Sequence, residues 1–328
     1  MSDAGPLALT MGDPAGIGAE IAVKAWASGA SEAPFFVIGD PDMLRRQTDS
    51  VVTEIAAPEE CAAVFADALP VLPMPLPAQA APGQPDPANA AQVIAWIERA
   101  VAFTRSGEAD AVVTNPINKK ALMDGAGFAF PGHTEYLAHL GGVARSVMML
   151  VSPLLRVVPV TIHIPLARVP SALNTELIEE TARIVAQALI RDFGIERPRL
   201  AVAGLNPHAG EDGAMGREEI EVIAPAIGRL RADGLDITGP LPADTMFHTS
   251  ARASYDAALA MYHDQALVPL KALDFAHGVN VTLGLPFIRT SPDHGTAYDI
   301  AGTAQADPTS LIEALNLAAR MVARRAAA

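Results

Sequence analysis

Three histidines occupy equivalent places in this sequence. His163, His208 and His263 each follow a short apolar run that is typical of a buried strand, and each lies near a Pro or Asp. Because strand carboxyl ends share one edge of a doubly wound sheet, three imidazoles could meet there and bind a divalent metal. Asp264 and Asp244 could be further ligands or partners of the rings. The alternative is that each is a hydrogen-bonded loop histidine.

A second group of candidates is basic and lies in polar segments between apolar runs. The group comprises Lys120, Lys271 and Arg289. Cations are few in this acidic chain, and glycines lie near these three. This pattern indicates a pocket for a phosphate or carboxylate, although a solvated surface charge is usual for lysine. Asn280 lies in a strand-like run, 279–283, where a polar side chain needs a partner.

Two turns that precede helices carry further candidates. His133 lies beside Thr134, the expected N-cap of a helix over residues 136–140, and a ligand role and a structural role for this histidine are equally open. Residues 12–18 (GDPAGIG) form a glycine loop between a strand and a helix, which is a common phosphate cradle. The loop lacks the third glycine of the dinucleotide fingerprint and the Lys-Ser/Thr of the P-loop. A tight turn that needs glycine dihedrals is therefore favoured.

The elements that must position these residues alternate between strands and helices. Apolar runs predict strands over 6–11, 34–40, 51–55, 111–114, 146–151, 155–164, 198–205 and 255–262. The 3.6-residue period predicts helices over 19–26, 89–104, 177–193 and 218–232. Seven prolines within 70–87 indicate an extended surface loop. Such alternation implies an α/β protein with mainly parallel strands covered on both faces, in two lobes.

The totals of the sequence limit the classes of function. A chain of 328 residues with 50% hydrophobic residues can bury one large core or two. A net charge of -14 argues against a nucleic-acid partner and against an anionic membrane. The only cysteine is Cys61, which excludes an intrachain disulfide and a thiolate zinc site. Without a signal peptide pattern or a run of about 20 apolar residues, we expect a cytoplasmic protein.

Seven segments carry a resemblance that extends over nearly the whole chain. They are residues 11–20 (MGDPAGIGAE), 114–119 (TNPINK), 131–135 (PGHTE), 204–213 (GLNPHAGEDG), 239–247 (GPLPADTMF), 261–265 (MYHDQ) and 278–302. On these segments the sequence resembles the 4-hydroxythreonine-4-phosphate dehydrogenase family of pyridoxal phosphate synthesis. Ala19 stands where the family often has proline, which affects no catalytic position.

The resemblance implies a two-lobed fold like that of isocitrate and isopropylmalate dehydrogenases, with a cleft between the lobes. Residues 1–135 with 272–328 would form the first lobe, and residues 136–271 would form the second, which carries the metal ligands and the dimer contact. The tail over 293–302 is similar to the cofactor loop of those enzymes. It implies that NAD or NADP contacts His294, Gly295, Thr296 and Asp299.

The resemblance also implies the site. One divalent metal, Zn, Mg or Co, would be held by His163, His208 and His263. Substrate contacts would come from His133, Thr134, Lys271, Asn280 and Arg289. Lys271 and Asp264 are candidates for the general base, as is a metal-bound water. A homodimer would have its active site at the subunit interface, so that the ligands need not come from one chain.

The implied reaction is a metal-dependent oxidation of 4-phosphohydroxy-L-threonine at its C3 alcohol by NAD(P). The product, 2-amino-3-oxo-4-phosphooxybutanoate, would lose CO2 to give 3-amino-2-oxopropyl phosphate. A sibling dehydrogenase acting on 4-phosphoerythronate, 4-phosphothreonate or a cyclic diol is the nearest alternative. A non-catalytic metabolite-binding protein and a metal-dependent hydrolase are alternatives from other classes.

Overall fold

The computed structural model describes residues 5–47 and 51–327, and the chain divides into two compact units. The first unit runs to Arg145 and resumes with Leu285–Ala327, and the second comprises Ser146–Gly284. The junctions expected after residues 135 and 271 would fall inside helices α6 (His133–Gly141) and α11 (His263–Leu273). A helix is a cooperative, hydrogen-bonded element that is rarely divided between two units. Both boundaries between the units therefore fall after the ends of these helices.

The first unit is built on parallel strands in the order β3-β4-β2-β1-β5-β12. Their bounds are β1 (Leu7–Thr10), β2 (Phe35–Gly39), β3 (Val52–Glu54), β4 (Leu69–Pro73), β5 (Ala111–Thr114) and β12 (Ile288–Pro292). Continuous buried runs form β1, β2 and β5, as parallel strands covered on both faces require. The predicted α/β class is confirmed.

Strand β4 corrects the expectation for the proline-rich segment. Residues 70–87 were expected to be surface loop, but Leu69–Pro73 pairs with both β2 and β3, and its first four residues are buried. Proline lacks the N–H that a central strand normally donates, which is why the segment did not look like a strand. Val71 and Leu72, fully or nearly buried, supply the apolar contacts that favour pairing.

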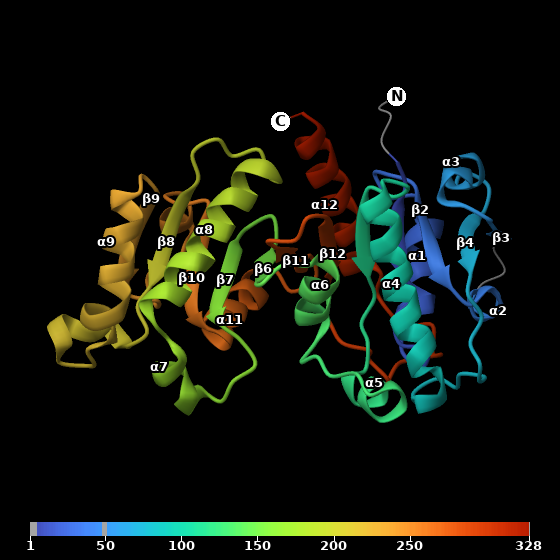
Figure 1. The fold of residues 1–328 in the computed structure, drawn as a ribbon, viewed down its shortest axis with the longest axis horizontal. Helices are drawn as coiled ribbons and strands as arrows, with labels where there is room; N and C mark the ends of the chain where they lie inside the picture. The colour runs from blue at the N-terminus through green and yellow to red at the C-terminus, as the bar shows by residue number, and fades with distance from the viewer. Residues whose placement is uncertain (1–4, 48–50, 328) are drawn as a thin grey trace. The chain divides into compact units, whose positions relative to one another are not determined.

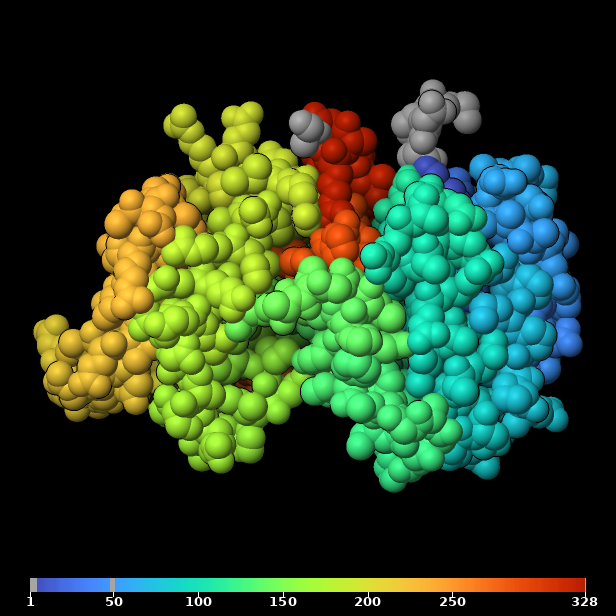
Figure 2. Space-filling model, viewed as in Figure 1, coloured from blue at the N-terminus to red at the C-terminus, as the bar shows by residue number. Residues whose placement is uncertain are grey.

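Helices cover this sheet. They are α1 (Gly18–Ala27), α2 (Pro41–Arg45), α3 (Cys61–Val64), α4 (Ala90–Ser106), α5 (Lys119–Ala126), α6 and α12 (Thr309–Ala326). The long helix α4 buries Trp96 completely, and the indole Nε1 donates to the Met74 carbonyl at 3.0 Å. Helix α4 is followed by Gly107, which takes the left-handed C-cap conformation with φ 83°. Side chains of α4 and α5 form much of the surface of this unit in the view of Figure 2.

The second unit has a mixed sheet in the order β11-β6-β7-β10-β8-β9. Its strands are β6 (Val147–Val151), β7 (Arg156–Thr161), β8 (Arg199–Ala203), β9 (Asp236–Leu241), β10 (Ala257–Tyr262) and β11 (Val279–Leu283). Strands β7, β10, β8 and β9 are parallel, whereas β6 is antiparallel to both of its neighbours. Figure 1 shows these strands with helices α8 and α9 alongside.

The helices of the second unit are α7 (Val169–Ala172), α8 (Thr175–Arg191), α9 (Ala224–Ala232), α10 (Thr249–Arg252) and α11. Two short irregular segments, η4 (Pro207–Gly213) and η5 (Glu219–Ile223), separate β8 from α9. Helix α11 occupies eleven residues for which the sequence pattern predicted no helix. Among the described helices, none has the length and apolar character needed to cross a bilayer.

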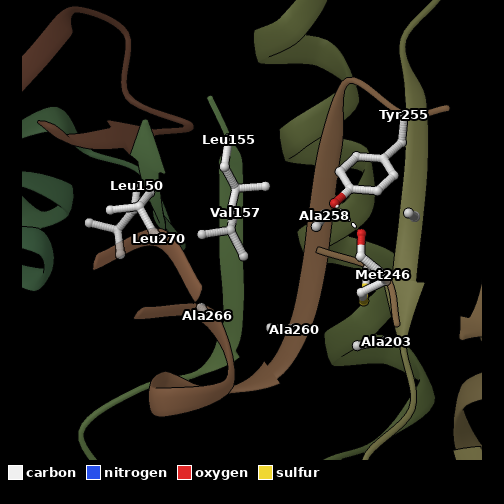
Figure 3. Close-up of a cluster of buried hydrophobic side chains, with 11 residues drawn as sticks. Leu150, Leu155, Val157, Ala203, Met246, Tyr255, Ala258, Ala260, Ala266 and Leu270 are labelled. Carbon is white, nitrogen blue, oxygen red and sulfur yellow. Dashed lines mark hydrogen bonds between the residues drawn. The ribbon is translucent and has the colours of Figure 1, made fainter. Parts of the chain in front are cut away.

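A buried apolar cluster fixes α11 to the sheet of the second unit. Ala266 and Leu270 of α11 pack with Leu150, Val157 and Ala260 of the strands (Figure 3). Burial of such side chains contributes about 25 cal/mol per Å² of apolar surface removed from water. The first residue of α11 is His263, so the cluster places a candidate metal ligand at a defined position.

Candidate active site

The three predicted metal ligands follow adjacent parallel strands of the second unit. Strand β10 pairs in parallel with β7 on one side and with β8 on the other. His163, His263 and His208 come shortly after the carboxyl ends of β7, β10 and β8 respectively. The expectation that all three lie past the same edge of a sheet is therefore met, and we call this the histidine edge.

Two of these rings come close together. The ring centroids of His163 and His263 are 5.9 Å apart. Both rings line a pocket of roughly 210 Å³, together with Asp264 and the end of each strand, Thr161 and Tyr262. Nδ1 of His263 is 2.7 Å from Oδ1 of Asp264, so the carboxylate orients this imidazole and leaves Nε2 for a ligand.

The backbone at the histidine edge is strained. His163 has φ 47° rather than continuing strand β7, which ends two residues earlier. His208 has φ 52° and begins a run of left-handed residues that extends to Asp212. L-residues rarely adopt this conformation, and such strain is concentrated at functional sites. The sequence predicted strand through residue 164 and gave no sign of this geometry.

The donor set suits a borderline divalent metal, but one chain does not complete the shell. Two imidazoles, one of them braced by a carboxylate, are ligands of the type that such metals prefer. Within residues 5–47 and 51–327, however, no three His, Cys, Asp or Glu side chains are arranged so that they could hold an ion. His163 and His263 are thus brought together, and His208 is not brought into a common shell with them.

In the first unit, Arg289 is the central candidate for binding an anion. It lies on β12 rather than in a loop, opposite Val112 of β5, and only 2% of it is exposed. Its Nη2 donates to Oγ1 of Thr114 at 2.6 Å. Burial lowers the pKa of Arg289 to about 9, so the guanidinium still carries its charge at neutral pH. A charge held in this environment is strongly stabilised by an anionic partner.

His133 lies close enough to Arg289 for the two side chains to interact electrostatically. Burial, with smaller contributions from Arg289 and Lys119, holds the pKa of His133 well below its usual range. The residue is partly exposed as a whole, but its Nε2 is enclosed and has no hydrogen-bond partner among the described residues. This neutral ring is thus free to contact a ligand. Helix α6 begins at His133 with Gly132 as its N-cap, which corrects the N-cap expected at Thr134.

Lys119 is a candidate that the sequence did not single out. A Cβ at Gly132 would be 3.2 Å from its Nζ, so the glycine leaves room for the ammonium beside His133. Lys120, which was singled out, is instead an exposed residue of α5 paired with Asp124 at 2.6 Å. The two lysines are adjacent in the sequence, but their side chains point in different directions. Only the side chain of Lys119 lies near Gly132.

The remaining substrate candidates lie in the second unit. Lys271 is in the last turn of α11, not in a loop, and its Nζ is 5.3 Å from the centre of the Phe275 ring. Asn280 lies on β11 opposite Leu150, and its Oδ1 is buried without a partner in the described part of the chain. A buried amide oxygen in this state is a candidate contact for a donor on a ligand.

The tail that resembles a cofactor loop packs against the glycine loop. The Thr296 carbonyl accepts from the Ile17 amide at 3.1 Å, and a Cβ at Gly16 would be 2.8 Å from that oxygen. Gly12 has φ 81°, which confirms the tight turn. The N-terminal end of α1 therefore donates to a carbonyl of the tail loop, at Thr296.

A partly buried pair, which the sequence did not reveal, ties the two loops together. The Tyr298 hydroxyl donates to Oδ2 of Asp13 at 2.9 Å, and burial raises the pKa of Asp13. Of the expected cofactor contacts, His294 has a buried Nε2 with no partner among the residues described, and Gly295 borders open space. These features fit a loop that receives a nicotinamide cofactor. Only the separation of 285 residues hid the pair from sequence reasoning.

Histidines that follow parallel strands, a buried arginine and a structured tail loop are features of an α/β enzyme. Residues 31–318 match the family described as pyridoxal phosphate biosynthetic protein PdxA, and the chain belongs to that family.

Relatives of known name agree with this family. The 4-hydroxythreonine-4-phosphate dehydrogenase of Paracoccus denitrificans (strain Pd 1222) is 59% identical over 99% of this chain and 100% of its own. The crystal structure of the enzyme of that name from Klebsiella pneumoniae matches with TM-score 0.88 at 42% identity, over 98% of this chain and 99% of that one.

A solved structure with a different name is also similar. A terephthalate 1,2-cis-dihydrodiol dehydrogenase from Burkholderia xenovorans LB400 matches with TM-score 0.66 at 33% identity, over 96% of this chain and 97% of that one. The scaffold therefore also occurs in a dehydrogenase named for a cyclic diol.

Proposed function

We propose that this chain catalyses the 4-hydroxythreonine-4-phosphate dehydrogenase reaction in pyridoxal phosphate biosynthesis. The observation that carries the proposal is the 59% identity to a dehydrogenase of that name over 99% of the chain. The buried Arg289 beside the neutral His133 supports it, because a phosphorylated amino acid brings anionic groups that a buried guanidinium binds.

The reaction proposed is oxidation of the C3 alcohol of the substrate, with the hydride passing to NAD or NADP. When bound, the nicotinamide supplies the hydride acceptor, and His294, Gly295, Thr296 and Asp299 would hold it. The β-keto acid formed then loses CO2, because the ketone accepts the electron pair of the broken bond. The final product is 3-amino-2-oxopropyl phosphate.

The proposed metal is held by His163, His208 and His263. When bound, a divalent cation supplies a Lewis acid that lowers the pKa of the substrate hydroxyl. Lys271 and Asp264 are the proposed carriers of the hydroxyl proton. Oδ1 of Asp264 is engaged with His263, so Asp264 also orients a ring.

We also propose that the chain acts as a homodimer with its active site at the subunit interface. His208 is not in a common metal shell with His163 and His263 in one described chain. Beside His163, the apolar side chains of Leu166 and Ile164 are 66% and 40% exposed. Such exposed apolar residues next to an incomplete site favour cover by a second copy.

The test is an assay of the purified chain with 4-phosphohydroxy-L-threonine. We expect reduction of NAD or NADP, loss of that activity after chelation, and recovery on adding Zn, Co or Mg. Absence of nicotinamide reduction with every metal would contradict the proposed reaction. Activity that survives complete removal of metal would contradict only the metal assignment.

A sibling dehydrogenase is the second candidate, favoured by the similarity to the cis-dihydrodiol dehydrogenase. Parallel assays with 4-phosphoerythronate, 4-phosphothreonate and a cyclic cis-diol distinguish the two. Preference for a phosphorylated hydroxy acid without an amino group, or for the diol, measured as kcat/KM, would reassign the substrate while keeping the scaffold and the cofactor.

A further inference from the structure

The segment that carries His208 has an unusual backbone. Residues 208–212 all have positive φ, between 42° and 84°, and together they form a left-handed turn. Only Gly210 is a glycine, so His208, Ala209, Glu211 and Asp212 adopt a conformation that L-residues avoid. Such a turn persists only where its surroundings fix it.

A buried carboxylate lies at the start of this turn. Glu219 is 3% exposed, and its Oε1 accepts from the backbone N–H of Asn206 at 2.7 Å. Its Oε2 accepts from Nδ2 of the same asparagine at 2.9 Å. The Asn206 carbonyl in turn accepts from the Ala209 amide at 3.1 Å, inside the turn. Glu219 thus fixes the residue from which the turn begins.

Glycines let the chain wrap tightly around this carboxylate. A Cβ at Gly204 would be 3.1 Å from Oε1 of Glu219, and a Cβ at Gly210 would be 2.5 Å from Oε2. Gly216 likewise leaves room for Asn206, because a Cβ there would be 2.3 Å from Nδ2. The spacing of these glycines matches a segment folded around the Glu219 side chain.

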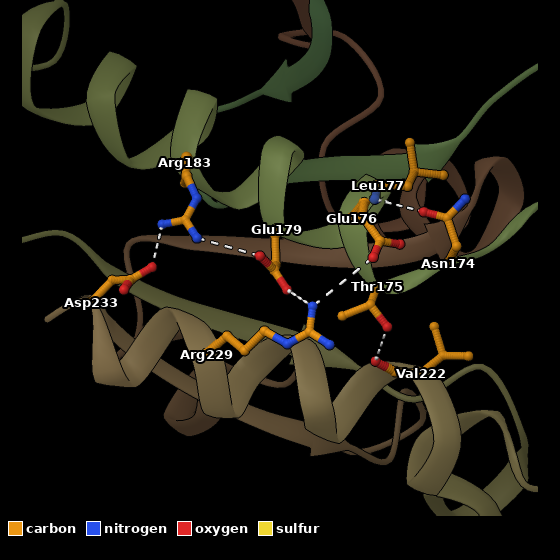
Figure 4. A network of polar contacts seen from close by, with 9 residues as sticks. All are labelled: Asn174, Thr175, Glu176, Leu177, Glu179, Arg183, Val222, Arg229 and Asp233. Atoms are coloured by element: carbon orange, nitrogen blue, oxygen red, sulfur yellow. Dashed lines mark hydrogen bonds and ion pairs between the residues drawn. The ribbon is translucent and has the colours of Figure 1, made fainter.

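The helix that presents Glu219 is itself held in place. Glu219 opens the π-helical segment η5, which continues into α9, and π-helical turns are frequent at functional sites. Oγ1 of Thr175 on α8 donates to the Val222 carbonyl at 3.5 Å (Figure 4). Arg183 pairs with Asp233, and Arg229 with Glu179, so ion pairs join α8 to α9 and its C-terminal end.

The carboxylate has no role in ion pairing that would explain its burial. Among residues 5–47 and 51–327, no Lys, Arg or His forms an ion pair with Glu219. Burying a carboxylate is unfavourable unless hydrogen bonds replace its hydration. The hydrogen bonds that replace it here are those from Asn206. Its contacts are therefore directed at the turn.

We propose that Glu219 is a positioning residue, which holds Asn206 and the left-handed turn so that His208 is presented for metal binding. This inference rests on the proposed function, in which His208 is a metal ligand. In this role Glu219 contacts neither the substrate nor the cofactor. Its effect on the reaction passes entirely through the conformation of residues 206–212.

The experiment compares Glu219→Ala, Glu219→Gln and the control Glu221→Gln in the full chain. Glu221 lies in the same π-helical segment but is exposed and pairs with Arg217 on the surface. Each metal-free protein is titrated with Co²⁺, followed by its visible absorption, and the amides of residues 206–215 are followed by hydrogen exchange. We expect Glu219→Ala to bind Co²⁺ about 10- to 100-fold more weakly, as loss of residues that orient metal ligands does.

The two other variants sharpen the test. Glu219→Gln keeps one accepting oxygen and should fall between the wild type and Glu219→Ala, whereas Glu221→Gln should match the wild type. Hydrogen exchange should rise at 206–215 in Glu219→Ala and less in Glu219→Gln. Excess Co²⁺ should restore turnover of Glu219→Ala, since the ligands remain. If Glu219→Ala does not fold, Glu219→Gln carries the test with the same measurements.

Two results would overturn the proposal. The first is an unchanged Co²⁺ affinity in both Glu219 variants although hydrogen exchange in the turn becomes faster. The second is hydrogen exchange at residues 206–215 that stays at the wild-type rate in both variants. A wild type that binds Co²⁺ through His208, with binding lost in His208→Ala, but reduces no nicotinamide would contradict the proposed reaction and leave this inference standing. Co²⁺ binding that is unaffected by His208→Ala would overturn the inference itself.

Discussion

Arg289 is a single buried cation that can bind an anionic group in an otherwise acidic protein. Its guanidinium is enclosed beside Thr114, and the chain around it is acidic overall, with net charge -14. Electrostatic interactions are stronger inside a protein than in water, so one enclosed cation can bind an anion in spite of the unfavourable overall charge. The net charge of -14 disfavours contact with polyanions over the rest of the chain.

We predict that Arg289→Ala raises KM for the phosphorylated substrate roughly 10- to 100-fold, because hydrogen bonds to charged groups contribute about 1.5–3 kcal/mol. Steady-state kinetics at saturating cofactor measure the change. Lys120→Ala is the control, since Lys120 is exposed and paired with Asp124, and its KM should stay at the wild-type value. An unchanged KM in Arg289→Ala would contradict a substrate contact for Arg289.

His133 leads to a prediction about the pH dependence of stability. Its folded pKa is lowered below the ordinary 6.5, so above that pH it is neutral in both the folded and unfolded states. As pH falls below 6.5, the unfolded chain takes up a proton that the folded chain resists. The free energy of unfolding then decreases with falling pH, by up to about 1.4 kcal/mol per pH unit from this residue.

Urea unfolding of the wild type and His133→Gln between about pH 7.5 and pH 5.5 checks this prediction. Gln carries no titrating group at this pH, so its stability should decline less steeply than that of the wild type. Carboxylates elsewhere affect both proteins alike and cancel in the difference. Equal slopes for the two proteins would show that the imidazole titrates normally in the folded state.

At the scale of elements, the strands were predictable where burial on both faces gives an unbroken apolar run. Strands β1, β2 and β5 lie within the ranges expected for them. Strand β4 was hidden by its prolines, and α11 by Pro269 within it and by the polar residues around it. In both elements, tertiary packing overrode a local sequence preference.

The candidate site was predictable by residue type and only partly by geometry. The repeated strand-to-histidine context identified one edge of a sheet, because strand order in parallel sheets constrains where carboxyl ends lie. The left-handed turn at His208, the Asp13–Tyr298 pair and the placement of Lys119 depend on contacts between distant segments. No periodicity or spacing in the sequence encodes such contacts.

The pairing of the glycine loop with the tail loop yields a prediction at the scale of elements. Tyr298→Phe removes the hydroxyl that donates to Oδ2 of the buried Asp13, which should destabilise the chain by about 1–3 kcal/mol. Because the tail is the proposed cofactor loop, KM for NAD(P) should rise several-fold while KM for the substrate changes little. Thermal unfolding and kinetics with each reactant varied in turn measure the two effects.

The control for this variant is Tyr255→Phe. The Tyr255 hydroxyl donates to the Met246 carbonyl at 2.8 Å in the apolar cluster of the second unit. This variant also loses a buried hydrogen bond, so its stability should fall, but KM for NAD(P) should not change. Similar increases in cofactor KM in both variants would mean that lost stability, and not the tail loop, is responsible.

At the scale of the whole molecule, the proposed metal needs a further ligand besides the two imidazoles that come together at the histidine edge. In the described chain, His163 and His263 come together without a third ligand from His208. The proposed homodimer, with two-fold symmetry, would supply this ligand, because each of two identical sites would then take ligands from both copies. Dimerisation would then be a condition for metal binding and for catalysis.

Shared sites make a prediction about mixed dimers. Homodimers of His208→Ala and of His263→Ala should each be inactive, since every site lacks a ligand. In a heterodimer of the two variants, a shared arrangement places both substitutions in one site and leaves the other site intact. We therefore expect heterodimers, isolated by two different affinity tags, to regain about half of the wild-type activity and one bound metal per dimer. If each chain supplied all of its own ligands, both sites would keep a defect, and the heterodimer would be as inactive as either parent.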